Sequence, residues 1–190
     1  MIKSLLGASV RLSILLALAA CAAPLASVPA NSIDSPSAAN ALVTIMLPKF
    51  TNSAKITNQY LPMIPGVTDV YNGKKGPKAE LDTVYTMRRT KRIIGIPCVI
   101  QLDTGYLNGQ VVEKTLDYFA QDAFGNVWYF GEDATQYRHG KVNGHRGSWM
   151  SGKNGAQPGI LMEAVPRVGD QYNQENAPGL AEDKAEVLSL

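Results

Sequence analysis

Alternation of apolar and polar side chains between turn signals restricts the fold of this chain more than any other feature. Along residues 80–88, a mostly apolar set alternates with a polar set: Leu81, Thr83, Tyr85 and Met87 against Glu80, Asp82, Thr86 and Arg88. A period of two is that of a half-buried strand. Asn108-Gly109, a strong hairpin signal, separates two further strands expected at 96–106 and 111–121. We expect these two strands to pair antiparallel.

The rest of the chain repeats this spacing of strand and turn. Strands are expected at 67–71, 127–130, 137–142 and 146–150, with turns at 122–126, 140, 143–144 and 152–155. A possible helix at 179–187 is the exception after residue 40. The 17 Gly and 11 Pro fit many short connections. We predict a mainly β fold, an antiparallel meander that is open or partly closed into a barrel.

Charge excludes one class of partner. The chain has 18 Lys and Arg against 16 Asp and Glu, a formal net charge of +2. So small an excess gives no strong field to attract nucleic acid. We therefore expect no nucleic-acid partner.

The first twenty residues have the features of an export signal. Lys3 and Arg11 precede an uncharged apolar run at 12–20. This run is shorter than the ~20 residues of a membrane-spanning helix and suits the core of a signal peptide. We expect residues 1–20 to be removed.

The run ends in Leu18-Ala19-Ala20-Cys21, which resembles the lipobox of bacterial lipoproteins. The resemblance implies cleavage after Ala20 and lipid on the sulfur of Cys21, which would become the first residue. Cysteine is required there because its sulfur is the nucleophile. Several acyl chains would hold the protein at a membrane, its expected partner. Ala22 at the next position implies sorting to the outer membrane, facing the periplasm. An ordinary secretory peptide is the alternative.

Two segments are expected after the signal. Residues 21–57 comprise the lipidated cysteine and a tether that is rich in Ala, Ser and Pro up to about residue 40. That composition buries too little apolar surface to fold. The apolar run 42–48 could be a strand or part of the tether. The β-rich domain is expected at 58–190.

Four segments resemble an uncharacterised family of bacterial exported proteins and lipoproteins: 58–68, 117–133, 147–159 and 168–185. The resemblance covers most of residues 58–190 and implies a β-rich exported domain with no established activity. The chain departs from it in two respects. Phe124 stands where relatives carry an acid in the turn 122–126, and the relatives continue for several more strands. The second departure implies a C-terminally truncated member.

The candidate metal ligands are Asp122, Glu132 and Asp133, which could meet near one hairpin end and hold Ca²⁺ through oxygen atoms. Turn capping is the simpler interpretation, since Phe124 replaces an acid. His139 and His145 lack a third ligand, so we expect no metal there and no cofactor.

Aromatic residues provide a candidate ligand site. Trp128, Tyr129 and Trp149 lie in neighbouring predicted strands and could line a cavity for a lipophilic or sugar ligand. Packing of a core explains the same residues more simply, with Trp128 and Phe130 facing inward and Tyr129 facing the other side. Cys98 is expected to be a small buried residue rather than a reactive thiol.

No catalytic motif is present. Ser148 lacks the flanking glycines of a hydrolase elbow, and no histidine–acid pair is placed by a motif. We expect a non-enzymatic binding or structural domain whose partner is a small ligand or an envelope protein. The alternatives are a carrier of a lipophilic or sugar ligand and a hydrolase of envelope components.

Overall fold

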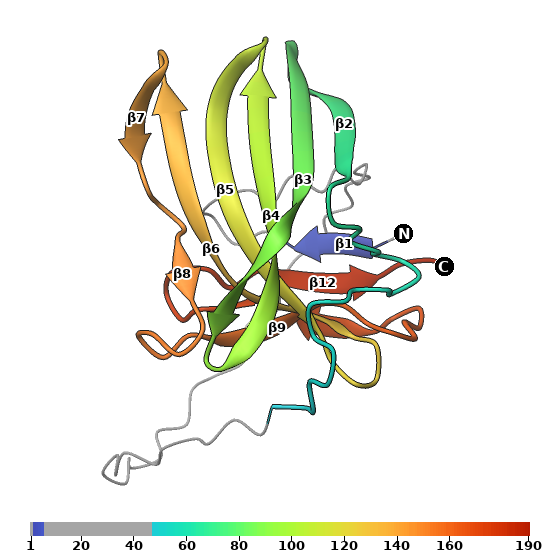
Figure 1. The fold of residues 1–190 in the computed structure, drawn as a ribbon. Coiled ribbons are helices and arrows are strands. Elements are labelled where there is room, and N and C mark those ends of the chain that lie inside the picture. Colours follow the sequence, from blue (N-terminus) through green and yellow to red (C-terminus); the bar gives the residue numbers. More distant parts are fainter. Residues whose placement is uncertain (1, 6–46) are drawn as a thin grey trace, which may run out of the picture. The chain divides into compact units, whose positions relative to one another are not determined.

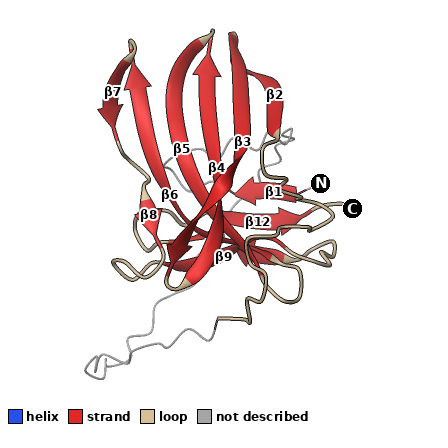
Figure 2. Ribbon diagram, viewed as in Figure 1, coloured by secondary structure: helices blue, strands red, loops and turns tan. Residues whose placement is uncertain are grey.

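The computed structural model describes residues 2–5 and 47–190 of the 190-residue chain. These residues form twelve strands joined by turns and loops, and no helix occurs among them (Figure 2). The predicted mainly β fold is therefore confirmed.

A sheet of long antiparallel strands dominates the fold (Figure 1). Its five consecutive strands form a meander: β2 (Thr68–Lys75), β3 (Lys78–Ile93), β4 (Ile96–Leu107), β5 (Gln110–Gln121) and β6 (Val127–Arg138). The sheet continues past β6 through β9 (Gln157–Met162) and β11 (Glu175–Asn176). Two short strands, β7 (Lys141–Gly144) and β8 (Trp149–Met150), also pair with β6. The sequence order of the meander reflects its short hairpin turns.

A second, smaller sheet has the order β1-β12-β10. Its strands are β1 (Ile2–Leu5), β12 (Lys184–Val187) and β10 (Gln171–Asn173), all antiparallel. β12 lies where the sequence indicated a possible helix, so that expectation was wrong. Val187 and Ala185 of β12 are buried, which gives this segment a period of two.

Bulges curl the main sheet into a half-barrel. The register shifts at three places, where extra residues lie between Thr86 and Thr90 on β3, at Val112 on β5 and at Phe130 on β6. Each extra residue bends its strand and increases the local twist. The curl encloses one face of the meander, and this face carries the candidate site described below.

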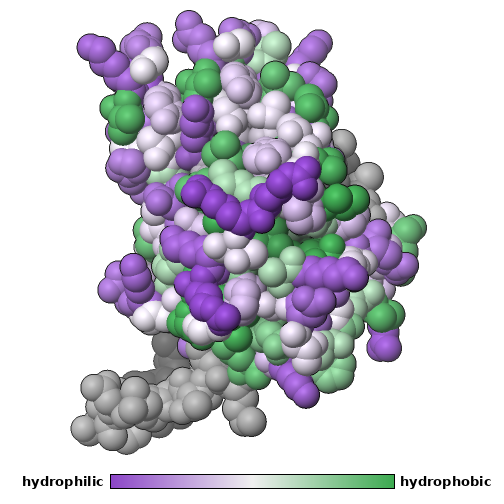
Figure 3. Space-filling model, viewed as in Figure 1, coloured by the Kyte–Doolittle hydropathy of each residue, from purple (hydrophilic) through white to green (hydrophobic). Residues whose placement is uncertain are grey.

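Two apolar clusters pack where the long strands cross the shorter ones. Phe119, Tyr129 and Trp149 belong to one cluster, and Tyr118 and Phe130 belong to the other. Both faces of β5 and β6 are therefore buried at this end of the sheet. In Figure 3, hydrophilic residues cover the tips of the long strands, and hydrophobic residues form separate patches between hydrophilic ones.

The hairpin signals of the sequence have mixed outcomes. Asn108 and Gly109 form the β4–β5 turn with φ values of 49° and 76°, as predicted for an Asn-Gly hairpin. The strand expected at 137–142 is instead the β6–β7 hairpin, which turns at His139-Gly140. The strand expected at 146–150 is reduced to β8.

The packed domain begins earlier than residue 58. Ile56 is buried in the first apolar cluster, and Phe50 packs edge-on against Trp128 and Phe130. Ser53 donates a hydrogen bond to the carbonyl of Pro97 at 2.6 Å. The predicted tether 21–57 is therefore wrong for residues 50–56. Phe50 and Ile56 are single apolar residues outside any regular alternation, so the sequence pattern did not indicate that this segment packs.

The β3–β4 turn contains backbone strain that a substitution can relieve. Ile94 has a φ of 42°, and its side chain is 46 % exposed. A β-branched residue is disfavoured in this left-handed region, whereas Asn followed by Gly is preferred in such turns. We expect Ile94→Asn to raise the free energy of unfolding by about 1 kcal/mol. Chemical denaturation measures this change. Val142→Asn, at an exposed strand position of ordinary φ, should give no gain; equal effects of the two substitutions would contradict the strain.

Candidate functional site

Acidic side chains share one face of the curled sheet. Register places Asp82 of β3 opposite Gly105 of β4, and Gly105 opposite Glu113 of β5. Residues two positions apart on one strand point to the same side. The same face therefore carries six carboxylates from four strands: Glu80, Asp82, Asp103, Glu113, Asp117 and Glu132.

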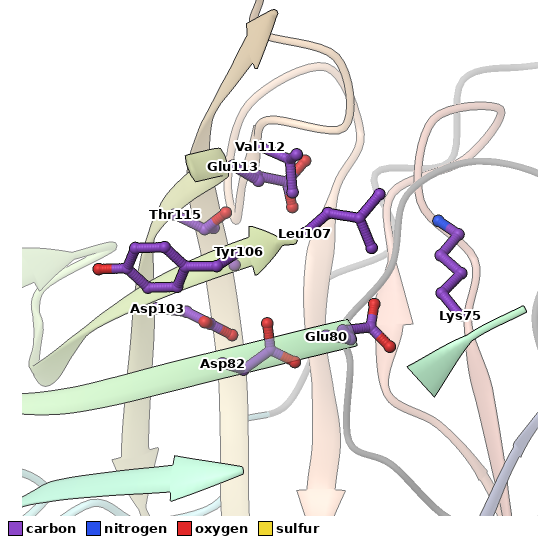
Figure 4. Close-up of a pocket in the computed structure, with 10 residues that line it drawn as sticks. Lys75, Glu80, Asp82, Asp103, Tyr106, Leu107, Val112, Glu113 and Thr115 are labelled. Carbon is purple, nitrogen blue, oxygen red and sulfur yellow. The ribbon is translucent and has the colours of Figure 1, made fainter. Parts of the chain in front are cut away.

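Four of these carboxylates line one pocket of about 200 Å³ (Figure 4). They are Glu80, Asp82, Asp103 and Glu113, and the other lining residues are Lys75, Gly105, Tyr106, Leu107, Val112 and Thr115. Figure 4 shows the side chains of Asp82 and Asp103 close to each other, with Lys75 standing apart at the rim. The pocket thus combines concentrated negative charge with two aliphatic side chains.

Burial changes the acidity of the two aspartates in this pocket. Burial, with smaller contributions from the charges of Glu80 and Glu113, raises the pKa of Asp82 to about 6. Burial, with the charges of Asp82 and Glu113, raises the pKa of Asp103 to about 7. The charges that act on both groups are those of other carboxylates. An added cation would favour the ionised form of each.

Asp82 is the least exposed of the four. Its side chain is only 5 % exposed, lines the pocket, and forms no hydrogen bond with any of the described residues. Asp103 Oδ1 is buried without a hydrogen-bond partner in the same part of the chain. Buried carboxylates are normally paired with cations or hydrogen-bonded. These two aspartates therefore point to a ligand that supplies positive charge.

Two neighbours help to shape the pocket. A Cβ atom added at Gly105 would lie 3.2 Å from Asp82 Oδ1, so the missing side chain leaves room for that carboxylate. Gln136 donates a hydrogen bond from Nε2 to Glu113 Oε2 at 2.8 Å. The hydrogen bond from Gln136 of β6 therefore fixes the Glu113 carboxylate at the side of the pocket, whereas Asp82 has no such bond from the described residues.

A buried tyrosine joins two deeper carboxylates on the same face. Tyr129 Oη lies 2.5 Å from Asp117 Oδ1 and 3.0 Å from Glu132 Oε2. The hydroxyl has one proton, so it can donate to one of these oxygens only. A proton on one of the two carboxyl groups would complete the second contact. The arrangement of Asp117, Tyr129 and Glu132 therefore favours a proton in addition to the tyrosine's own.

The acidity of the deeper cluster agrees with this conclusion. Burial raises the pKa of Asp117 to about 8, against the lowering effect of the Tyr129 hydrogen bond. Burial, with the charges of Asp117 and Glu175, raises the pKa of Glu132 to about 9. Glu175 on β11 is itself buried, and burial with the Asp183 charge raises its pKa to about 7. Asp103 also acts on Asp117, which links the cluster electrostatically to the pocket.

The three predicted metal ligands do not meet. Asp122 caps the turn 122–126, where it accepts hydrogen bonds from the backbone N–H of Phe124 and from the Trp128 indole at 2.8 Å each. Glu132 lies in the deeper cluster, whereas Asp133 is exposed on the opposite face of β6; both residues border a second cavity, and Asp122 does not. Turn capping is therefore confirmed for Asp122. The grouping of the three was wrong because neighbouring positions on a strand face opposite sides.

The aromatic residues build the core. Tyr129 stacks on Phe119 and meets Trp149 edge-on, and Trp128 packs with Phe50 on the other face. Tyr129 and Trp149 belong to one apolar cluster, and Trp128 is partly buried against the other. Trp149 also lines a second cavity of about 350 Å³ together with Glu132 and two lysines, Lys91 and Lys153.

Other single residues have structural roles. Cys98 is fully buried, and burial raises the pKa of its thiol to about 12, as expected for a packing residue. Ser148 Oγ accepts a hydrogen bond from the backbone N–H of Ala134 at 2.8 Å. His145 Nδ1 lies 3.0 Å from the Ala134 carbonyl, whereas His139 is in the β6–β7 turn. In the described ranges, no group of three or more His, Cys, Asp or Glu residues is placed to hold a metal ion.

The predicted lipid site lies outside the described residues. Ala20, Cys21 and most of the tether fall between residues 6 and 46. Within residues 2–5 and 47–190, there is no helix long and apolar enough to cross a membrane.

Sequence reasoning missed the acidic pocket although it identified the strands. Glu80 and Asp82 were placed together in the polar set of a half-buried strand, and no pocket was predicted from them. Asp82 and Thr86 are instead almost completely buried. Comparisons with protein-family models, with curated proteins and with solved structures found no match. The site is therefore interpreted from its own chemistry.

Proposed function

We propose that this chain is a lipid-anchored protein of the bacterial envelope whose acidic pocket binds a cationic ligand. The observation that carries the binding function is Asp82, a carboxylate more than nine-tenths buried that faces the pocket with no hydrogen bond from the described residues. A bound cation would satisfy this group and the buried oxygen of Asp103. It would also reduce repulsion among the four carboxylates, which is stronger in a partly buried site than in water.

Removal of one charge tests the pocket. We expect Asp82→Asn to weaken cation binding about tenfold, because a charge-assisted hydrogen bond contributes about 1.5–3 kcal/mol. Isothermal titration calorimetry of the purified protein with calcium chloride and with spermidine measures the effect. Asp133→Asn is the matched control, since it removes an exposed carboxylate from the opposite face. Failure of both cations to bind, or equal losses in the two variants, would contradict the proposal.

The membrane location rests on the sequence Leu18-Ala19-Ala20-Cys21. We expect the protein extracted from membranes to have a mass that corresponds to residues 21–190 plus a diacylglycerol and an acyl group. Cys21→Ser should leave the chain unlipidated. Cleavage after Ala20 would also remove β1 and leave its edge of β12 unpaired. An intact first segment, or an unmodified Cys21 thiol, would contradict the anchor.

Hydrolysis is a second candidate function that one observation favours. Asp82 and Asp103 adjoin in the pocket and have pKa values raised to about 6 and about 7, near the range of general acids and bases. A screen of ester, glycoside and phosphate substrates tests this function. Turnover that is lost in both Asp82→Asn and Asp103→Asn would establish an enzyme.

A further inference from the structure

We propose that the cation bound in the acidic pocket is an aliphatic polyamine, a chain of methylene groups carrying several ammonium groups. This inference rests on the proposed function and specifies its ligand class. It is carried by the unbonded Asp82 carboxylate, by the spread of the four carboxylates and by the aliphatic residues between them.

The carboxylates are spread too widely for one metal ion. They come from three strands, β3, β4 and β5, and none of the described residues forms a group of three ligands around one point. Asp82 and Glu113 flank Gly105 in one row across the sheet. Two strand spacings separate their backbones by about 10 Å. Such a row suits a ligand with charges at intervals.

Gly105 lies in the middle of this row and has no side chain. The space that its Cβ atom would take is bordered by Asp82 Oδ1 at 3.2 Å and by a methyl group of Val112 at 3.8 Å, and all of these residues line the pocket. A chain that lies in the pocket over β4 could place one ammonium group near Asp82 and Asp103 and another near Glu113. Each ammonium group has three N–H donors to share among carboxylate oxygens.

The pocket also offers contacts that only an organic cation can use. Leu107 and Val112 line it beside the carboxylates. Methylene groups gain free energy by leaving water against such side chains, about 0.8 kcal/mol for each fully buried CH₂. The cavity of about 200 Å³ exceeds the needs of one ion, since a single water takes about 30 Å³ of liquid. Lys75 also lines the pocket, apart from the carboxylates (Figure 4).

A comparison of the affinities of two cations tests the ligand class. Calorimetry of the purified protein at about 0.15 M salt, where nonspecific surface attraction is screened, compares spermidine with calcium chloride. We expect spermidine to bind at least tenfold more tightly and Asp82→Asn to weaken it about tenfold. Leu107→Ser keeps all four carboxylates, and it should weaken spermidine several-fold while leaving any calcium binding unchanged.

The possible outcomes separate this inference from the proposed function. Calcium that binds as tightly as spermidine, with both dependent on Asp82, would overturn the polyamine class and keep the cation pocket. Binding of neither cation would overturn both. Spermidine binding that is insensitive to Asp82→Asn and to Leu107→Ser would place the polyamine elsewhere on the surface and overturn the inference.

Discussion

The free energy of unfolding is expected to be higher at pH 5 than at pH 8. Burial raises the pKa values of Asp103, Asp117, Glu132 and Glu175 to between about 7 and about 9, whereas unfolded carboxyls have ordinary values of 3.8 and 4.5. Between these limits the native state retains protons that the unfolded state has released. Stability is therefore lost as pH rises from about 4 through the folded pKa values.

The contacts of Tyr129 give the expected size of this loss. They favour one extra proton in the cluster with Asp117 and Glu132, in agreement with the raised pKa values of the two carboxyls. One retained proton corresponds to about 1.4 kcal/mol per pH unit, or about 4 kcal/mol from pH 5 to pH 8. Urea denaturation at a series of pH values measures this slope. A protein more stable at pH 8 than at pH 5 would contradict the retained proton.

Replacement of one buried carboxyl by an uncharged amide identifies which group causes the change of unfolding free energy with pH. Glu132→Gln keeps the shape of the protonated carboxyl, and its amide can donate to Tyr129 Oη at the same position. We expect the variant to be more stable than the natural protein at pH 8 and to lose stability less steeply with pH. Glu182→Gln changes an exposed carboxylate and should leave the slope unaltered.

A large loss of stability is expected from Gly159→Ala. A Cβ atom at Gly159 would lie 2.3 Å from the carbonyl oxygen of Gln174 and 2.6 Å from that of Asn173. Both contacts are with backbone, so β9 and the segment before β11 must separate. Overpacking of this kind costs about 1–3 kcal/mol or more, and we expect about 3 kcal/mol. The displacement would also move Glu175 from the deeper acidic cluster.

Denaturation at pH 5 measures this effect, because the buried carboxyl groups of Asp117, Glu132 and Glu175 are then protonated and their titration does not contribute. Gly76→Ala is the control, since its Cβ would meet no atom within 4 Å and its φ of 61° adds only backbone strain. That variant should lose about 1 kcal/mol. Equal losses of unfolding free energy in the two variants would show that Gly159 is not tightly packed against the backbone of Asn173 and Gln174.

The strands were predictable because their signals are local. Alternation predicted β3, β4 and β5, and Asn108-Gly109 predicted the turn between β4 and β5. The predicted strand 127–130 is the first part of β6, which continues to Arg138. Its second part was missed because Gly131 and the polar residues after it interrupt the apolar pattern; β8 pairs with β6 at this point. Phe50 and Ile56 were missed because they pack through long-range contacts outside any strand.

The acidic pocket was not predictable from periodicity alone. Alternation assigns Asp82 to a face but does not say which face the bulged sheet encloses. Asp117 and Glu132 look solvent-exposed in sequence, and only their register opposite each other, with Tyr129 between them, makes them a buried pair. Two polar sets on β3 and β5, at 80–82 and 113–117, were the available signal.

Amide chemical-shift mapping of the purified protein, titrated with spermidine and then with calcium chloride, tests the cation pocket most directly. We predict saturable shifts at Asp82, Gly105 and Glu113, and none at Asp133 on the opposite face. Unperturbed amides at Gly105 and Asp82 at saturating concentrations of both cations would contradict the pocket as a cation-binding site.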